Sequence, residues 1–405
     1  MMKYKYYAGI LLLFSLLFRI TLQGLAFDTS LILRYEGSYF LSQQRINHTL
    51  RLDIDYFQEI SDDIFLEGDL VVQTSNKEYA RPFILGPNEL YLSGYNVIDN
   101  LDLRAGKIIT RWGAADLFSP LDNFNPMPPE ISLVKRQDRL GALGISATYY
   151  LNYTTYLQGV LMPRLKVTPY PDDFLKDSYL AEFDSDIDTV ELSYQQAEDI
   201  IWGIRLNHSF PSFDAALSYY RGYYMDPFPV SLSTYPGNSL EITLGYPEKQ
   251  VLGIEFQGEF PGIEGATLRG DLAYIIPQSW KFQGETMLDK PYLQTVIGAD
   301  YTTDSNLYLN GGFIYGLPFE RDNESSPYFY LSANQEIDDS DFKPFYAGLL
   351  NLSDMSMVNN IGLDYQLTES VTASMFCFLL LGEEQSILGQ FKRSQGLYFS
   401  LEWLF

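Results

Sequence analysis

The sequence predicts an all-β protein that forms a transmembrane antiparallel β-barrel of about 18 strands, or about 16 if two ambiguous segments are not strands. Segments of alternating apolar and polar residues recur along the chain. The connections between these segments alternate between short and long. Apolar residues make up 46% of the chain but are dispersed, and no run after residue 27 is long enough for a membrane-spanning helix.

The first segments after residue 27 show the alternation clearly. In residues 31–41, leucine, tyrosine and glycine occupy the odd positions, whereas Arg34 and Glu36 occupy even positions. Residues 50–56 and 64–73 repeat the arrangement, with charge again confined to one parity. Because successive side chains of a strand point to opposite faces, each segment has one apolar and one charged face. Such strands suit a barrel with a lipid-facing exterior and a hydrated bore.

The connections support the same architecture, in which short turns lie at one end of the barrel and long loops at the other. The predicted tight turns are at 61–63, 96–100, 151–153, 211–213, 261–265, 303–306 and 368–370. The predicted long polar connections are at 74–88, 112–138, 167–198, 225–248, 278–290, 318–326 and 383–393. The ambiguous segments are 240–247 and 327–350, and a barrel whose two ends emerge on one side requires an even strand count.

Both ends of the chain carry export features. A basic start and an apolar stretch from residue 8 to 18 precede a small-x-small pattern, so residues 1–26 are expected to be a secretory signal peptide and 27–405 a single barrel domain. At the other end, Leu401, Trp403 and Phe405 share one parity. This ending resembles the C-terminal assembly signal of bacterial outer-membrane β-barrels. The resemblance implies that the barrel-assembly machinery inserts the chain into the outer-membrane lipid of a Gram-negative-type bacterium.

Charge and cysteine content exclude several classes of protein. The formal net charge of −25 disfavours nucleic acid as a partner, because phosphates are neutralised by clustered lysine and arginine. Cys377 is the single cysteine, so the chain has no intramolecular disulfide. A barrel accommodates such a negative charge because its loops and bore lie away from hydrocarbon.

If the apolar side chains of each strand face lipid, the side chains at the alternate positions face the bore. The expected pore-lining arginines are Arg34, Arg51, Arg104, Arg205 and Arg269. The expected pore-lining carboxylates are Glu36, Asp53, Asp55, Glu67, Asp69, Asp102, Glu255, Glu259, Asp271, Asp300, Asp364 and Glu402. The excess of carboxylates favours cations or neutral polar solutes. The alternative is that these groups pair across strands and merely fill the interior.

The most distinctive segment is 101–130, which reads as a strand over Leu101–Arg111 followed by a loop rich in proline and aromatic residues. It contains the arrangement R-x-G, W-G, P-x-D and N-P, at Arg104, Gly106, Trp112, Gly113, Pro120, Asp122, Asn125 and Pro126. This arrangement resembles a segment of a poorly characterised porin-like family of Gram-negative outer-membrane proteins. The resemblance implies a barrel with a structured loop after the fifth strand. It does not indicate which solute is transported.

That loop is the candidate for a constriction. Its prolines stiffen the backbone, and a stiff loop at a barrel mouth is able to fold inward. In that case Asp116, Asp122 and Asn125 are expected to face Arg104 or Arg111 across a narrowed pore. The alternative is a loop that packs over the outer rim.

The sequence predicts neither a metal site, a cofactor nor a catalytic centre. Aspartates at 184, 186 and 188 lie in an acidic loop, but the spacing lacks the glycine and the final glutamate of an EF-hand. The histidines, His48 and His208, fall near opposite ends of the predicted barrel and are not expected to form one site.

The expected function is therefore an outer-membrane channel for passive diffusion of small polar solutes, with a cation-biased lumen. The alternative from another class is a structural or adhesive surface barrel with an occluded lumen. The many tyrosines and phenylalanines suit aromatic girdles at the two membrane interfaces, or a sugar-stacking surface inside the pore. The sequence specifies neither the solute nor the oligomeric state.

Overall fold

The computed structural model describes residues 28–41, 45–77, 81–127, 139–170, 172, 175–176, 189–235, 238–321, 324–337 and 340–405. The predicted signal peptide, residues 1–26, lies outside the described residues, as do Asp184, Asp186 and Asp188 of the acidic loop.

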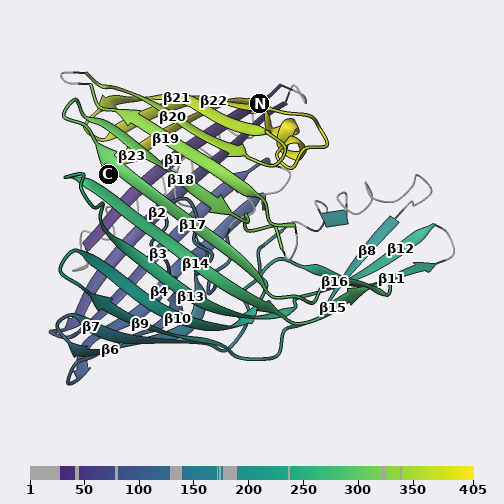
Figure 1. Ribbon diagram of the computed structural model, residues 1–405, viewed down its shortest axis with the longest axis horizontal. Coiled ribbons are helices and arrows are strands. Elements are labelled where there is room, and N and C mark those ends of the chain that lie inside the picture. Colours follow the sequence, from purple (N-terminus) through teal and green to yellow (C-terminus); the bar gives the residue numbers. More distant parts are fainter. Residues whose placement is uncertain are drawn as a thin grey trace.

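One antiparallel sheet of eighteen strands closes on itself to form a barrel (Figure 1). Each strand pairs with the next barrel strand along the chain, and β1 pairs with both β2 and β23. The barrel strands are β1 (Asp28–Phe40), β2 (Arg45–Ser61), β3 (Ile64–Ser75), β4 (Phe83–Ile98), β5 (Leu101–Ile108), β6 (Ala142–Asn152), β7 (Thr155–Met162), β9 (Ile201–Ser209), β10 (Phe213–Tyr223), β13 (Glu248–Glu259), β14 (Ala266–Pro277), β17 (Tyr292–Thr302), β18 (Leu307–Tyr315), β19 (Pro327–Gln335), β20 (Phe342–Asn351), β21 (Met357–Thr368), β22 (Val371–Leu381) and β23 (Gly396–Leu404).

The predicted count of eighteen strands is confirmed. Of the two ambiguous segments, 327–350 supplies the barrel strands β19 and β20. The other, 240–247, lies mostly in β12 (Ser239–Gly245), which belongs to a separate small sheet.

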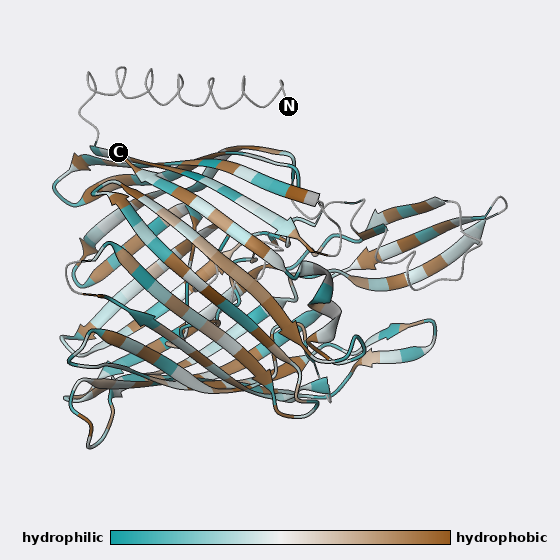
Figure 2. Cartoon of the chain, turned by 90° about the horizontal axis from the view of Figure 1, so that it is seen from above, coloured by the Kyte–Doolittle hydropathy of each residue, from teal (hydrophilic) through white to brown (hydrophobic). Residues whose placement is uncertain are grey.

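Alternation along the strands separates an apolar exterior from a polar interior. On β13, Leu252 and Ile254 are exposed, whereas Val251 and Glu255 on either side of them are buried. The same alternation is visible as bands of colour on the strands in Figure 2. Since the exposed side chains of this strand point outward from the closed barrel, Val251 and Glu255 face the bore.

The seam of the barrel joins the first strand to the last. Arg34 of β1 lies opposite Glu402 of β23 in the register, and the Phe405 N–H donates to the Leu31 carbonyl at 2.9 Å. The closure leaves no unpaired strand edge in the main sheet. This matters because an unpaired backbone group costs several kcal/mol in hydrocarbon.

The two ends of the barrel differ. One end carries tight turns, and the other carries long connections that project from the barrel (Figure 1). β8 (Thr189–Tyr194), β11 (Phe228–Tyr235) and β12 form a three-stranded sheet there. The same end carries the hairpin of β15 (Trp280–Phe282) and β16 (Glu285–Leu288), and the 3-10 helix η2 (Gly389–Ser394). Within the described residues, no helix is long and apolar enough to cross a bilayer.

The loops at this end are tied to one another. Burial opposes the charged form of Asp354, but hydrogen bonds from Ser356 and from the backbone N–H of Ile387 outweigh it, so the pKa of this carboxyl is lowered. Asp354 therefore remains charged and joins the connection after β20 to the one after β22.

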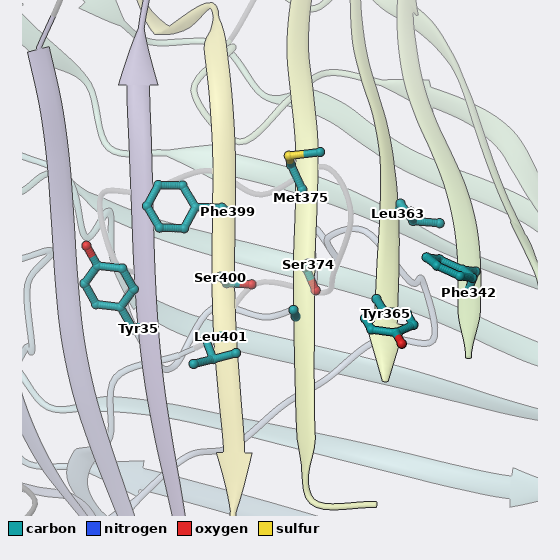
Figure 3. A pocket seen from close by; sticks show the side chains of 10 residues that line it. Tyr35, Phe342, Leu363, Tyr365, Ser374, Met375, Phe399, Ser400 and Leu401 are labelled. Carbon is teal, nitrogen blue, oxygen red and sulfur yellow. The ribbon is translucent and has the colours of Figure 1, made fainter. Parts of the chain in front are cut away.

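A large apolar hollow lies on the outer surface of the barrel and not in its bore. Its volume is about 510 Å³ (Figure 3). Outward side chains of β1, β20, β21, β22 and β23 line it, including Tyr35, Phe342, Leu363, Met375 and Phe399. The hollow belongs to the lipid-facing surface.

Ile361 and Thr372 offer a direct test of which face meets lipid. Ile361 is exposed on the apolar parity of β21, whereas Thr372 of β22 lies beside Glu402 in the register. Ile361→Arg is expected to lower the free energy of unfolding by about 2–4 kcal/mol in lipid vesicles, because it places a charge in hydrocarbon. Thr372→Arg, which adds the same charge next to a carboxylate in the bore, is expected to cost much less. Equal losses in urea unfolding would contradict the assignment.

Candidate functional site

The connection between β5 and β6, described over 109–127 and 139–141, enters the bore; we call it the inner loop. Its start is held by two carboxylates of the barrel wall. The Gly113 N–H donates to Glu255 Oε2 of β13 at 2.7 Å. The Ala114 and Ala115 N–H groups donate to the two oxygens of Asp271 on β14, at 2.8 and 3.0 Å. Hydrogen bonds to charged groups are the stronger kind, so these contacts form a latch between loop and wall.

The turn of the inner loop requires glycine at residue 113. Gly113 has a φ of +94°, a conformation that side chains disfavour. A Cβ at this position would lie 2.6 Å from Asp271 Oδ2 and would also overlap Ser119. The W-G pair of the sequence therefore places a bulky ring and a sharp turn next to each other at the latch.

Apolar side chains of the inner loop pack on an apolar part of the inner wall. Trp112, Leu121 and Phe124 are buried in one cluster with side chains of β6, β7, β9, β10, β13, β14 and β17. The wall makes room with glycine. A Cβ on Gly203 would lie 2.8 Å from the rings of both Trp112 and Phe124, and one on Gly253 would lie 2.5 Å from Leu121.

A second apolar cluster joins the inner loop to the adjoining part of the wall. Ala115 and Phe118 are buried there with side chains from β17 to β22. These are Val296, Ile314, Tyr328, Tyr330, Leu349, Val358 and Leu380. The inner loop and its two clusters thus occupy the side of the bore that runs from β6 to β22.

Asp122 and Asn125 hold the inner loop together and do not face a pore. Asn125 accepts from the Thr110 N–H at 2.8 Å and donates to the carbonyls of Ile108 and Leu140. Asp122 pairs with Arg139 at 3.0 Å, and the two side chains are only 2% and 7% exposed. The prediction that these residues face Arg104 or Arg111 is wrong, because the loop satisfies its own polar groups as it enters the bore.

Asp116 does reach the wall, but its partner is not the predicted one. It pairs with Arg269 of β14 at 2.5 Å and accepts from Asn310 of β18 at 2.9 Å. Arg269 also pairs with Asp300 of β17. This network ties the middle of the inner loop to three strands.

The wall formed by β1 to β5 and β23, which we call the hydrated wall, carries charged side chains that remain accessible. Arg34 pairs with Asp53 at 3.0 Å and with Glu402 at 2.7 Å, and the side chains of Arg34 and Glu402 are 32% and 43% exposed. Arg51 pairs with Asp53 at 2.6 Å. These exposures contrast with the dry Asp122–Arg139 pair, so water reaches this side of the bore.

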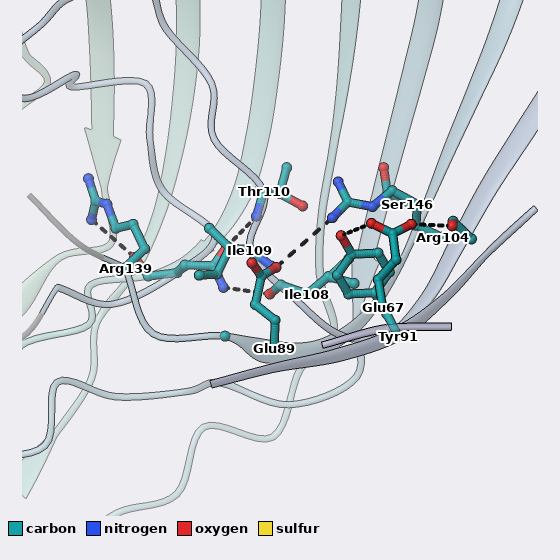
Figure 4. A network of polar contacts seen from close by, with 12 residues as sticks. Glu67, Glu89, Tyr91, Arg104, Ile108, Ile109, Thr110, Arg139 and Ser146 are labelled. Atoms are coloured by element: carbon teal, nitrogen blue, oxygen red, sulfur yellow. Dashed lines mark hydrogen bonds and ion pairs between the residues drawn. The ribbon is translucent and has the colours of Figure 1, made fainter. Parts of the chain in front are cut away.

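A second polar network on the hydrated wall lies near the entry of the inner loop (Figure 4). The Arg104 guanidinium lies 4.3 Å from the centre of the Tyr91 ring and 4.0 Å from Glu89. Glu67 accepts from the hydroxyls of Tyr91 and Ser93. Glu89 also accepts from the Ile109 N–H at 2.7 Å, which links the network to the inner loop.

The remaining predicted residues are spread over both sides of the bore. Arg205 pairs with Glu255 and donates to the Tyr156 hydroxyl at 2.9 Å. Glu36 pairs with Lys77, and Asp55 accepts from Ser30 and lies opposite Asp69 in the register. Asp102 accepts from the Asn96 N–H in a tight turn, while Glu259 and Asp364 lie toward the same end, on β13 and β21. Arg111 is exposed just after β5.

The latch predicts the effect of adding one methyl group. Gly113→Ala is expected to release the inner loop from Glu255 and Asp271 and to lower the free energy of unfolding by about 1–3 kcal/mol, because it combines strain with overlap. Gly262→Ala is the matched control: its φ is +87°, but nothing lies within 4 Å of the added Cβ. Hydrogen exchange of the Ala114 and Ala115 amides reports the release. Equal protection in the two variants would contradict the latch.

The buried Asp122–Arg139 pair gives a second prediction. Asp122→Ala leaves Arg139 buried opposite no carboxylate and is expected to lower the free energy of unfolding by about 3–5 kcal/mol. Replacing both residues by apolar ones, Asp122→Leu with Arg139→Met, is expected to recover most of that loss. Urea unfolding of the three variants gives the comparison, and a double variant no more stable than Asp122→Ala would refute a paired role.

Comparison of the sequence with protein-family models and with curated proteins finds no match. The fold resembles solved structures. The outer membrane protein opdK of Pseudomonas aeruginosa gives a TM-score of 0.57 at 7% identity, over 94% of this chain and 98% of that one. OccAB3 of Acinetobacter baumannii gives 0.53 at 9%, over 94% and 99%, and OpdQ of Pseudomonas aeruginosa gives 0.53 at 10%, over 94% and 98%. At these identities the similarity establishes the fold alone, a closed antiparallel β-barrel of eighteen strands.

Proposed function

We propose that the chain is a passive channel for small polar solutes in the outer membrane of a Gram-negative-type bacterium. The division of the bore carries the proposal. The inner loop and its apolar clusters fill one side, and the hydrated wall lines the other. Partly exposed pairs such as Arg34–Glu402 inside the barrel support a water-filled path along β1 to β5 and β23. The similarity in fold to the outer membrane protein opdK supports the location.

The apolar exterior supports outer-membrane lipid as the surrounding medium, and the terminal strand supports insertion by the barrel-assembly machinery. Solutes then cross by diffusion between the inner loop and the hydrated wall. The latch at Glu255 and Asp271 fixes how far the loop projects, and thus the width of the path. The charged and hydroxyl groups of the wall replace part of the hydration shell of a solute as it passes.

The carboxylates of the hydrated wall support a bias toward cations. Asp55 accepts a hydrogen bond from the neutral Ser30, and Glu67 accepts from the neutral Tyr91 and Ser93, so these contacts leave the negative charge in place. Asp69 lies directly opposite Asp55 in the register. Neighbouring carboxylates in a narrow bore raise the local concentration of cations.

A structural or adhesive surface barrel with a closed lumen is the second candidate. The burial of two apolar clusters within the bore favours it, as does the sheet of β8, β11 and β12 that projects beyond the barrel (Figure 1). Recording currents across planar bilayers separates the two candidates. Steady single-channel currents support the channel, and silence from correctly folded protein supports the closed barrel.

The carboxylate pair on β2 and β3 gives the selectivity test. Wild-type protein in a KCl gradient is expected to show a reversal potential of cation sign. Asp55→Asn combined with Asp69→Asn is expected to move that potential measurably toward zero, because two negative charges leave the wall. Glu241→Gln on β12 of the projecting sheet is the control and is expected to change little. Anion selectivity in the wild type would refute the proposed bias.

A further inference from the structure

A polar hollow of about 260 Å³ lies in the wall of the bore where the inner loop is latched. Backbone atoms of Gly113 and Ala114 border it on one side. Side chains of β7, β9, β10 and β13 border it on the others, toward the end of the barrel that carries the tight turns. We call it the Asn207 pocket.

The sheet register explains why a hollow forms here. Ala216 of β10 lies between Asn207 of β9 and Glu255 of β13 in one row across the strands. Because alanine is short, Ala216 adds little bulk between these two longer side chains, both of which line the hollow. In the next row toward the turns, Asp214 lies between Ser209 and Gln257, so the space is also bordered by polar groups on that side.

The pocket holds polar groups that the protein itself leaves unused. Asn207 is only 7% exposed, yet its side-chain amide makes no hydrogen bond to any residue that the structure describes. Its amide atoms are not sealed off from the hollow, so they are open to water and available to a solute that replaces this water. The charged pair deeper in the pocket is already occupied, since Arg205 binds Glu255 and the Tyr156 hydroxyl.

We propose that the Asn207 pocket binds a neutral polyhydroxylated solute, a sugar or polyol, during its passage; the inference rests on the proposed channel function. Hydroxyl groups both donate and accept, as do the side-chain amides of Asn207 and Gln257. Asp214 supplies an acceptor for adjacent hydroxyls at the open side. The one arginine is neutralised by Glu255, so no free cation is available to hold an anionic solute.

The size of the pocket limits the solute. At roughly 30 Å³ for each water in the liquid, the hollow of about 260 Å³ corresponds to about nine waters, which is enough room for a monosaccharide. Among Asn207, Asp214 and Gln257, the least exposed is Asn207, an amide and not a carboxylate, which favours a neutral ligand over an ammonium ion.

The test uses single-channel recording of the full barrel in planar bilayers, with D-ribose as the probe. Ribose is expected to interrupt the wild-type current. Asn207→Leu is expected to shorten the interruptions about fivefold, because one hydrogen bond to the solute is lost. Ala216→Leu adds bulk between Asn207 and Glu255, which line the hollow, without removing a polar group, and it is expected to abolish the interruptions. Asn360→Leu, which removes a bore-facing amide from β21 at a distant point of the barrel, is the control and is expected to leave them unchanged.

The outcomes separate this inference from the channel itself. If ribose does not interrupt the wild-type current, the proposed sugar site is wrong while the channel function stands. Interruptions of equal length in wild type and in Asn207→Leu would have the same meaning. A third outcome would overturn the proposal by assigning the pocket to a cation. In that case putrescine interrupts the wild-type current but not the current of Asp214→Asn, and ribose interrupts neither. Folded protein that passes no current at all would contradict the proposed channel function, and with it the inference that rests on it.

Discussion

The constraint on which the rest of this structure depends is that hydrocarbon offers no hydrogen-bond partners to a peptide backbone. A sheet that spans a bilayer must therefore close, and here β1 closes against β23 along nine paired positions from Ile32–Leu404 to Phe40–Gly396. Closure fixes an inside and an outside for every strand. When the apolar side chains of a strand face lipid, the charged side chains at the alternate positions must face the bore. Pairs such as Arg34–Glu402 then form there across the seam.

Within that closed wall, a few wall residues determine what the bore contains. Glu255 and Asp271 capture three consecutive N–H groups of the inner loop, and Gly203 and Gly253 leave room for its bulky side chains. The loop consequently lies against one side, and the hydrated charges remain on the other. In the proposed channel, the width of the path and its chemistry thus follow from the same contacts.

Strand count and parity could be predicted from sequence because both depend on local alternation and turn composition. The strand predicted over Leu101–Arg111 is observed to end at Ile108. The reason is that the next N–H groups, of Ile109 and Thr110, bind Glu89 and Asn125 instead of a neighbouring strand. The latch could not be predicted, since its donors are backbone groups without a sequence signature and its acceptors lie 142 and 157 residues away. Proline content indicated a stiff loop but not which of its side chains would be buried.

The central claim is that water and solutes pass between the inner loop and the hydrated wall. The most direct test places a cysteine at position 34 (Arg34→Cys) in a chain carrying Cys377→Ser, and adds a charged, water-soluble thiol reagent during current recording. The account predicts that the reagent reacts and lowers the single-channel conductance. A thiol at residue 34 that does not react, or that reacts without any change in the current, would contradict it.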